Sequence, residues 1–250
     1  MTFRDHFSRQ AALYATYRPS YPPELFEFLA GLAPARKLAW DCATGSGQAA
    51  VALAGHFERV VATDASAEQI SHAEQAEKVT YEVALAHASR LDAHSADLIT
   101  VAQALHWLDL DEFYSEVRRV AVESGVVAVW GYGDPVMDTP ALERIVHAFN
   151  RGTIEDYWTK NRDILLDGYR SVDFPFREFI APPFRLEKHW TLTELAGYFR
   201  TWSATNRFIA ARGFDPVSAV EGELEGEWGG AEKRHLITWP VYLRVGAVSG

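Results

Sequence analysis

The sequence predicts an α/β fold in which a mostly parallel sheet carries helices on both faces. Between residues 38 and 133, short apolar runs alternate with helical patterns, and this alternation is typical of a parallel sheet. The run at residues 96–103 is apolar almost throughout, as expected for a strand buried on both faces. Another apolar run, at residues 38–41, leads into a turn with two glycines and then into a helical pattern, which is how a βαβ unit begins.

The stretch before the first strand, residues 1–36, is a lead-in of mixed character. We expect a short helix near its start, an irregular segment at residues 14–23 that is rich in tyrosine and proline, and a helix from about residue 24. Tyr17, Arg18 and their neighbours either pack locally or form a lid over a binding site, and the sequence leaves both readings open.

The predicted core, residues 37–133, contains five strands. They are expected at residues 38–41, 59–64, 79–86, 96–103 and 126–133. Helices are expected at residues 48–54, after a capping box at residues 66–69, and at residues 111–122, where Ser124 and Gly125 end the last of them.

The composition changes after residue 133. Residues 134–184 are expected to form helical pieces and loops that are dense in aromatic side chains. A strand is expected to begin at residue 184 and to lead into the last segment, residues 185–250. In that segment we expect a helix that begins with a capping box at 191–194, more helix at 203–230 and a closing strand at 236–245. Pro240 in that closing strand suggests an edge or a bulge. The chain, residues 1–250, is predicted to be a single domain.

Composition limits the class of protein. The net charge is −10 without a basic block, so nucleic acid is not an expected partner. No run approaches the ~18 apolar residues of a membrane helix, and the first residues lack the apolar core of a secretory signal. The single cysteine, Cys42, fits a reducing compartment, so a cytoplasmic protein is expected. His56, His72, His94 and His147 show no metal-ligand spacing, and no metal site is predicted.

The glycine turn points to a nucleoside as ligand. Gly45 and Gly47 let the backbone pass close under a bound group, and the strand at 59–64 ends in Asp64, from which a carboxylate reaches the two hydroxyls of a ribose. Residues 45–50 also satisfy the looser dinucleotide pattern, so the spacing leaves nicotinamide cofactors open beside S-adenosylmethionine. Asp41 favours S-adenosylmethionine, because a carboxylate repels a pyrophosphate and attracts the ammonium of an amino-acid tail.

Along its whole length the chain resembles the class I S-adenosylmethionine-dependent methyltransferases (methyltransferase type 11-like). The matching stretches are Tyr17-Arg18-Pro19, residues 41–47, residues 63–66, Ala102-Gln103-Ala104-Leu105-His106-Trp107, residues 130–133 and residues 195–206. Within that class the chain is similar to the trans-aconitate methyltransferase group. The resemblance implies a Rossmann-like, seven-stranded, mostly parallel sheet with an antiparallel last strand. It also implies that residues 134–184 form a cap inserted after the fifth strand, with residues 185–250 completing the sheet and the substrate pocket.

The resemblance further implies a set of cofactor contacts. They are Asp41, Ala43, Gly45 and Gly47 at the methionine end, Asp64, Ala65 and Gln69 at the ribose, Ala88 and Ser89 at the adenine, Gln103, Ala104 and His106 beneath the sulfonium, and Tyr17 and Arg18 from the lead-in. Ala43 stands where the class most often has its first glycine, so we expect the turn to avoid positive φ there. Ser89 stands where relatives commonly have an acid, so its hydrogen bond to adenine is expected to be weaker or bridged by water.

The cofactor determines the expected chemistry. A sulfonium-bound methyl is already activated, so transfer is an in-line displacement that needs the acceptor held at about 3 Å and water excluded. A carboxylate acceptor needs no base, and Arg18, His106, Arg200 and Arg207 are the candidates to hold it, with Trp107, Trp130, Tyr132 and Trp202 as walls. A hydroxyl or amine acceptor would make His106 the base. In both cases His106 is the predicted catalytic residue.

Other interpretations remain open at this point. Arg200 and Arg207 fit internal salt bridges at least as well as substrate binding, and the aromatic side chains after residue 133 fit a core. An NAD(P)-dependent oxidoreductase and a cofactor-binding module without catalysis are the alternative functions. The main prediction is transfer to a small-molecule substrate with S-adenosylhomocysteine as product, by a monomer or homodimer with no nucleic-acid or membrane partner.

Overall fold

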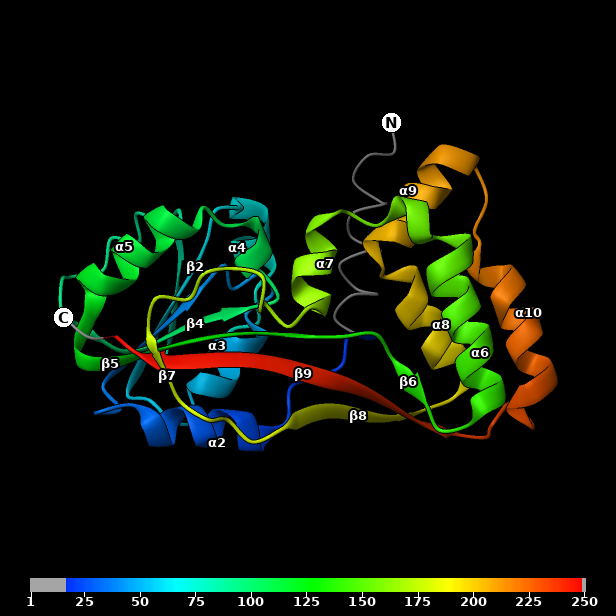
Figure 1. The fold of residues 1–250 in the computed structure, drawn as a ribbon, viewed down its shortest axis with the longest axis horizontal. Coiled ribbons are helices and arrows are strands. Elements are labelled where there is room, and N and C mark those ends of the chain that lie inside the picture. The colour runs from blue at the N-terminus through cyan, green and yellow to red at the C-terminus, as the bar shows by residue number, and fades with distance from the viewer. Residues whose placement is uncertain (1–16, 249–250) are drawn as a thin grey trace. The chain divides into compact units, whose positions relative to one another are not determined.

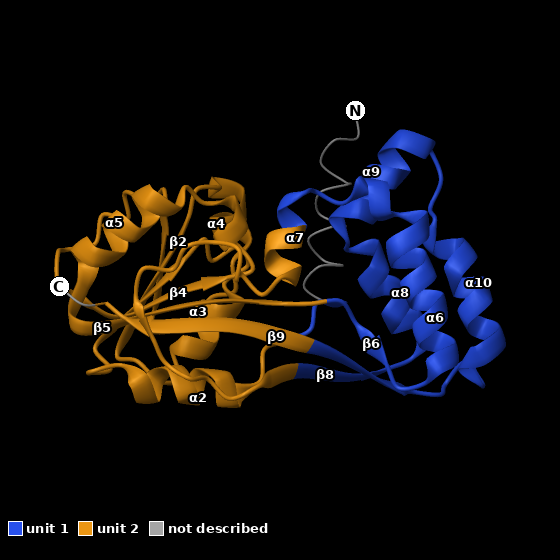
Figure 2. Cartoon of the chain, in the orientation of Figure 1, with its two compact units in different colours: residues 1–19, 134–162, 186–239 blue, residues 20–133, 163–185, 240–250 orange. Residues whose placement is uncertain are grey.

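The computed structural model describes residues 17–248, and within them the chain divides into two compact units (Figure 2). Unit 1 comprises residues 17–19, 134–162 and 186–239, and unit 2 comprises residues 20–133, 163–185 and 240–248. The short helix expected near the start of the chain lies outside the described residues.

Unit 2 is built on a parallel sheet. Its first five strands are β1 (Leu38–Cys42), β2 (Arg59–Asp64), β3 (Val79–Val83), β4 (Ala96–Ala102) and β5 (Ala121–Tyr132). They lie in the order β3-β2-β1-β4-β5, and each neighbouring pair is parallel. β9 (His235–Ala247) follows β5 in the sheet and runs antiparallel to it (Figure 1). The predicted parallel sheet with an antiparallel last strand is therefore confirmed.

The sheet contains nine strands, because two short pairings join the seven that were predicted. β8 (Phe184–Trp190) is the predicted strand that begins at residue 184, and it pairs with β9. The additional strands are β6 (Val136–Met137) and β7 (Arg177–Glu178), which also pair with β9. Two residues carry no alternation of apolar and polar side chains, so a sequence pattern does not reveal such strands.

Helices cover both faces of the sheet in unit 2. On one face, α2 (Pro23–Leu32) and α3 (Gln48–Leu53) bury Leu25, Leu29 and Leu53 against the strands. On the other face, α5 (Leu110–Val120) buries Phe113 and Val117 in a cluster that also contains residues after α7 (Asn161–Leu166). In Figure 1, α5 lies above the strands and α2 below them. The short α4 (Ala67–His72) follows β2.

Unit 1 is mainly helical. It contains α6 (Pro140–Ala148), a π-helical turn η2 (Phe149–Thr153), the 3-10 turn η3 (Glu155–Tyr157), α8 (Leu192–Arg200), α9 (Ser203–Arg212) and α10 (Val217–Trp228). Thr191 and Glu194 form the predicted capping box at the start of α8. Aromatic side chains form its core, with the ring centroids of Phe199 and Trp202 4.7 Å apart. No helix within residues 17–248 is both long and apolar enough to cross a membrane.

Two local expectations are corrected. The helix expected at residues 111–122 ends at Val120, and β5 begins at once, so Ser124 (φ 62°) belongs to an irregular register at the start of that strand. Pro240 does not lie in an edge strand, because β9 pairs with β7 and β8 as well as with β5 and β6. Pro240 stands where β9 changes partner, after Thr238 has paired with β6 and before Val241 pairs with β5. A residue without an N–H is tolerated there because neither ladder needs one.

Candidate functional site

The glycine turn after β1 has left-handed backbone at three positions. Ala43, Gly45 and Gly47 have φ values of 54°, 55° and 82°. The expectation that the turn avoids positive φ at Ala43 is therefore wrong: the path of the turn, and not the residue type, determines the conformation there, with a strain of about 1–3 kcal/mol. A Cβ at Gly45 would meet nothing within 4 Å, whereas one at Gly47 would lie 2.2 Å from the Tyr81 hydroxyl. The turn is thus open at Gly45 and covered at Gly47.

Asp41 lies near the carboxyl end of β1 and is only 1% exposed. Its Oδ1 accepts a hydrogen bond from the Thr100 hydroxyl at 2.7 Å, and its Oδ2 accepts one from the Thr44 hydroxyl at 2.5 Å. Burial raises the pKa of Asp41 to about 6, and the nearby carboxylate of Asp64 adds to the effect. A positive charge beside this turn would favour the ionised form of Asp41.

Asp64 ends β2 and holds the glycine turn from the other side. Its Oδ2 accepts from the amide of Gly45 at 2.9 Å, and its Oδ1 accepts from the amide of Ser66 at 2.8 Å. The Ser66 hydroxyl in turn accepts from the amide of Gln69 and caps α4. Ala65 and Gln69 are exposed and Asp64 is half-buried, so these residues form one accessible corner at the carboxyl end of β2.

Ser89 lies in the segment after β3 and is completely buried. Its amide and its hydroxyl both donate to Oε1 of Glu116 on α5, at 2.9 and 2.6 Å. Burial of Glu116 opposes its charged form, but hydrogen bonds from Arg119 and Ser89 outweigh that effect and lower the pKa of Glu116 to about 2. The Ser89 side chain therefore anchors the segment that carries the exposed Ala88, and its hydroxyl proton is already engaged.

Gln103 follows β4 in left-handed backbone, with φ 59°. Its amide donates to the carbonyl of Trp130 at 2.7 Å. Its Nε2 is buried and has no hydrogen-bond partner among the described residues. A Cβ at Gly131 would lie 2.8 Å from Cδ1 of Leu165 and 3.2 Å from Oε1 of Gln103, so only glycine lets these side chains close over β5. A buried amide donor of this kind is unfavourable unless a further group accepts from it.

His106 lies on the 3-10 turn η1 (Leu105–Trp107) after β4. Burial lowers the pKa of His106 to about 4, so its imidazole is neutral at pH 7 and is not a cationic group for a carboxylate. Its Nδ1 is 3.4 Å from the hydroxyl of Tyr169, a residue that is 0% exposed. Ala104 precedes the turn, and Trp107 is 58% exposed at its end.

The other two aromatic residues predicted as pocket walls in unit 2 lie on β5. The Trp130 ring packs edge-on against Tyr21 and Phe26, with centroids 5.6 and 6.1 Å away, and is completely buried. Tyr132 is also buried and lies 6.2 Å from Tyr21. In this unit, then, Trp130 is a core residue on the face covered by α2.

The remaining predicted residues lie in unit 1. Arg200 donates to Asp215 at 2.8 Å and to Glu221 at 2.9 Å, so its charge is compensated by two carboxylates. Arg207 is exposed and donates to the carbonyl of Tyr157 at 3.1 Å. The contacts of Arg200 match the internal salt-bridge interpretation, whereas the contact of Arg207 is a hydrogen bond to a backbone carbonyl.

The last three predicted residues of unit 1 also make internal contacts. Trp202 is buried beside Phe199. Arg18 donates to the carbonyl of Thr201 and lies over the Tyr198 ring. Tyr17 packs so closely on α8 that a Cβ at Gly197 would lie 2.7 Å from its ring.

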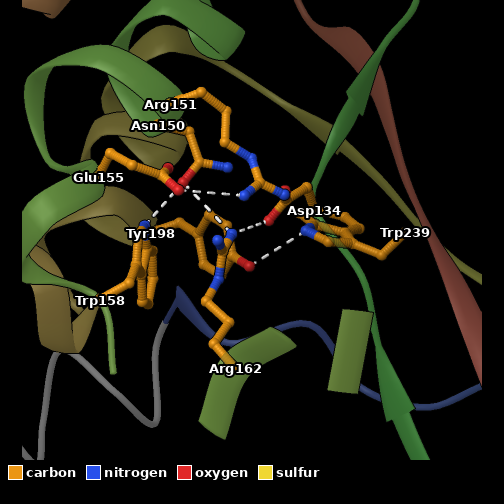
Figure 3. Close-up of polar contacts among 8 residues, drawn as sticks. All are labelled: Asp134, Asn150, Arg151, Glu155, Trp158, Arg162, Tyr198 and Trp239. Atoms are coloured by element: carbon orange, nitrogen blue, oxygen red, sulfur yellow. Dashed lines mark hydrogen bonds and ion pairs between the residues drawn. The ribbon is translucent and has the colours of Figure 1, made fainter. Parts of the chain in front are cut away.

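A polar cluster in unit 1 has no counterpart in the sequence expectations (Figure 3). Arg162, whose side chain is 11% exposed, forms an ion pair with Asp134 and lies 4.0 Å from the centroid of the Trp158 ring. Arg151 pairs with the same Asp134 at 3.2 Å. Asn150 Oδ1 accepts from Nε1 of Trp158 at 2.9 Å. No local signal in the sequence indicates this cluster, because Arg151 and Arg162 follow Asp134 by 17 and 28 residues.

The geometry of unit 2 is typical of α/β proteins that bind a nucleoside at the carboxyl ends of their strands. Carboxylates end the adjacent strands β1 and β2, the glycine turn lies between them, and Gln103 and His106 follow β4. Among residues 17–248, no group of His, Cys, Asp or Glu side chains is arranged to hold a metal ion.

Comparison with known proteins gives the family. The sequence model described as "Methyltransferase domain" matches residues 40–129. A protein of Dictyostelium discoideum named "Putative methyltransferase" is 32% identical over 247 residues, covering 96% of this chain and 94% of that protein. A solved structure from Anaeromyxobacter dehalogenans, described as a "Putative Type II Methyltransferase", is 40% identical with a TM-score of 0.88, covering 93% of this chain and 99% of the other. The chain belongs to the methyltransferase family.

A third relative bears on the cofactor. It is a protein of Saccharomyces cerevisiae named "Probable S-adenosylmethionine-dependent methyltransferase", which is 27% identical over 176 residues and covers 63% of this chain and 59% of that protein. With the class I fold of unit 2, the protein is an S-adenosylmethionine-dependent methyltransferase.

Proposed function

We propose that the protein transfers the methyl group of S-adenosylmethionine to a carboxylate oxygen of a small molecule. The observation that carries this proposal is the environment of His106, whose pKa is lowered to about 4 by burial. A base with so low a pKa is poorly matched to removing a proton from a hydroxyl or an ammonium at pH 7. A carboxylate is already ionised at that pH and needs no base.

The side chains of unit 2 fit this cofactor. A carboxylate has about four acceptor positions, and Asp64 uses two of them for the amides of Gly45 and Ser66, which leaves two for the hydroxyls of a ribose. Asp41 supplies negative charge for the ammonium of the methionine tail. The space above Gly45 accommodates a ligand close to the backbone.

The remaining contacts follow the order of the strands. Ala65 and Gln69 would flank the ribose, and Ala88 would face the adenine from a segment held by Ser89. Gln103 offers the buried Nε2 donor described above, and Ala104 and His106 follow it. When bound, S-adenosylmethionine would supply a methyl carbon activated by its sulfonium for displacement by an ionised oxygen, with the sulfide as leaving group. No proton is transferred, so the residues here have to orient the acceptor and exclude water.

The cofactor part of the proposal is tested by calorimetric titration with S-adenosylmethionine and S-adenosylhomocysteine. We expect Asp64→Ala to weaken binding at least about 100-fold, because two charge-assisted hydrogen bonds to the ribose are lost. Asp111→Ala is the matched control, since it removes the same side chain from an exposed position on α5. Equal affinities for the wild type and Asp64→Ala would refute the ribose contact.

The acceptor part is tested with S-adenosylmethionine labelled in its methyl group and panels of small carboxylic acids, phenols and amines. A methyl ester releases labelled methanol in mild base, whereas a methyl ether or a methylamine does not. We expect base-labile label with members of the acid panel alone. Transfer to phenols or amines with base-stable label would overturn the carboxylate proposal and leave the methyltransferase activity intact.

A further inference from the structure

Tyr169 is a buried residue held in an unfavourable backbone conformation. Its φ is 60°, and it follows Gly168, whose φ is 71°. Positive φ is a genuine outlier for a bulky residue, and such residues persist only where the surroundings determine them. The side chain is 0% exposed and lies in the core cluster that includes residues of α5 and α7.

The backbone of Tyr169 is fixed by two elements of unit 2. Its amide donates to the carbonyl of Ile164 on α7 at 2.9 Å. Its carbonyl accepts from Nη1 of Arg244 on β9 at 2.8 Å, and the same nitrogen donates to the carbonyl of Val172 at 2.8 Å. Glu178 on β7 pairs with Arg244 at 2.6 Å and orients the guanidinium. These backbone contacts fix the position from which the Tyr169 side chain extends, and the hydroxyl takes no part in them.

The hydroxyl of Tyr169 meets His106. Nδ1 of His106 is 3.4 Å from the hydroxyl oxygen, and the two rings are nearly parallel, with an interplanar angle of 21° and centroids 6.2 Å apart. Burial raises the pKa of Tyr169 well above its ordinary value, so the hydroxyl keeps its proton. Within residues 17–248, Nδ1 of His106 is the hydrogen-bond partner recorded for this hydroxyl.

The hydrogen bond between the Tyr169 hydroxyl and Nδ1 indicates which of its two tautomers the neutral His106 adopts. If the Tyr169 hydroxyl donates to Nδ1, its proton is satisfied and only acceptor lone pairs remain unused. If Nδ1 carried the proton and donated to the hydroxyl, the buried O–H would have no acceptor in the described part of the chain, and a buried donor left without an acceptor is costly. The first arrangement is favoured, and the imidazole proton is then on Nε2.

We propose that Tyr169 is a positioning residue that fixes the tautomer and the orientation of His106, so that Nε2 of His106 is a hydrogen-bond donor and not a base. This inference rests on the proposed function, and it specifies the acceptor class further. With Nδ1 engaged by the Tyr169 hydroxyl and the proton on Nε2, the ring has no lone pair available to remove a proton from a phenol or alcohol, whereas a carboxylate enters without one. Arg244 and Glu178 support the arrangement by holding the backbone of Tyr169.

The test is a long-range ¹H–¹⁵N correlation spectrum of protein with ¹⁵N-labelled histidine, recorded without cofactor or acceptor. His106 is assigned from the signals lost in His106→Gln. We expect Nε2 to carry the proton and the Nδ1 resonance to show an accepted hydrogen bond. In Tyr169→Phe the Nδ1 resonance should move to the position of an unbonded acceptor, and kcat should fall about tenfold with an unchanged KM for S-adenosylmethionine.

Two further variants keep the test decisive. Tyr114→Phe removes another buried hydroxyl from the same cluster, one that donates to the carbonyl of Asp173 at 2.8 Å, and it should leave the His106 signals unchanged. Arg244→Lys keeps the Tyr169 hydroxyl but loosens the backbone of Tyr169, and it should shift Nδ1 in the same direction even if Tyr169→Phe does not fold. A proton on Nδ1 in the wild type, or His106 signals that Tyr169→Phe and Arg244→Lys leave unchanged, would overturn the proposal.

The spectra also separate this proposal from the proposed function. They require no turnover, so a protein that methylates phenols can still show the Nε2 tautomer; the carboxylate proposal and the acceptor preference drawn from the tautomer would then fail, and the positioning role of Tyr169 would stand. Conversely, methyl esters formed by a protein whose Nδ1 carries the proton would leave the proposed function standing without a positioning role for Tyr169.

Discussion

A buried carboxylate lies at each end of the parallel sheet, and the two differ in their hydrogen-bond partners. At the amino end, Asp97 of β4 is 3% exposed, and its Oδ2 accepts from the amides of Lys37 and Leu38 at 2.9 and 3.0 Å. At the carboxyl end, Asp41 is buried to a similar degree, but its main partners are two threonine hydroxyls, with a smaller contribution from the backbone of Ala50, and burial raises its pKa to about 6. The two carboxylates are similarly buried, but hydrogen bonds offset the cost of burying the charge at the amino end and offset it only partly at the carboxyl end.

The same difference extends to neighbouring groups. At the carboxyl end, Gln103 has a buried amide nitrogen without an acceptor among residues 17–248, and His106 is kept neutral by burial. Left-handed backbone does not separate the two ends, since Ser124 at the start of β5 has a φ as positive as that of Ala43. Unmet electrostatic and hydrogen-bonding requirements, more than strain, therefore mark the end of the sheet where ligands bind in such folds.

The largest expected effects come from two isosteric substitutions that change the free energy of unfolding in opposite directions. The pKa of Asp41 is about 6 in the folded chain, above its ordinary value of 3.8. Ionisation of Asp41 therefore favours the unfolded state, by about 3 kcal/mol once the pH exceeds 6. Asp41→Asn should therefore stabilise the ligand-free protein at pH 7 by up to about 3 kcal/mol, and the gain should vanish as the pH falls to 4. Asp97→Asn should destabilise it by about 2 kcal/mol, because charge-assisted bonds to two amides are weakened.

Urea unfolding at pH 7 and pH 4 measures both free energies of unfolding. The control is Asp111→Asn, which removes the same charge from the surface of α5 and should change the free energy by less than about 0.5 kcal/mol. If Asp41→Asn and Asp97→Asn both destabilise the protein at pH 7, the distinction between the two ends is mistaken.

The next effect concerns the pH dependence of cofactor affinity. Since Asp41 protonates below about pH 6, a ligand with a cationic ammonium should bind about tenfold more weakly at pH 5 than at pH 7. Asp41→Asn should bind more weakly at pH 7 and show no such dependence. Calorimetry with S-adenosylhomocysteine across this range measures the slope. A flat profile for the wild type would mean that the charge of Asp41 does not take part in binding.

The sheet of unit 2 was predictable from the sequence because β1, β4 and most of β5 are apolar on both faces and α4 begins with a recognisable cap at Ser66. The positions of Asp41, Asp64 and the glycine turn followed from the same pattern. The two-residue strands β6 and β7 were not predictable, since pairing with β9 is a tertiary effect without local periodicity.

The candidate site was less accessible to sequence reasoning. Ser89 could not be recognised as the anchor of Glu116, because that contact joins residues 27 apart in the chain. Tyr169 was missed for a similar reason, since its contact with His106 spans 63 residues and no motif precedes it except Gly168. Arg200 was selected for its charge, but only the fold reveals that Asp215 and Glu221 already compensate it.

The smallest expected effect tests whether the strain in the glycine turn matters for binding. Ala43→Gly relieves a left-handed alanine (φ 54°) and should stabilise the protein by about 0.5–1 kcal/mol, after allowing for the greater freedom of glycine in the unfolded chain. Ser124→Gly is the matched control, because it relieves a similar φ of 62° at the amino end of β5 and should give a similar gain. Affinity for S-adenosylmethionine should decrease about two- to threefold in Ala43→Gly alone, since alanine restricts the turn beside Asp41 and glycine releases it. Equal affinities in both variants would show that the turn is held by Asp64 and Tyr81 and not by its own side chain at position 43.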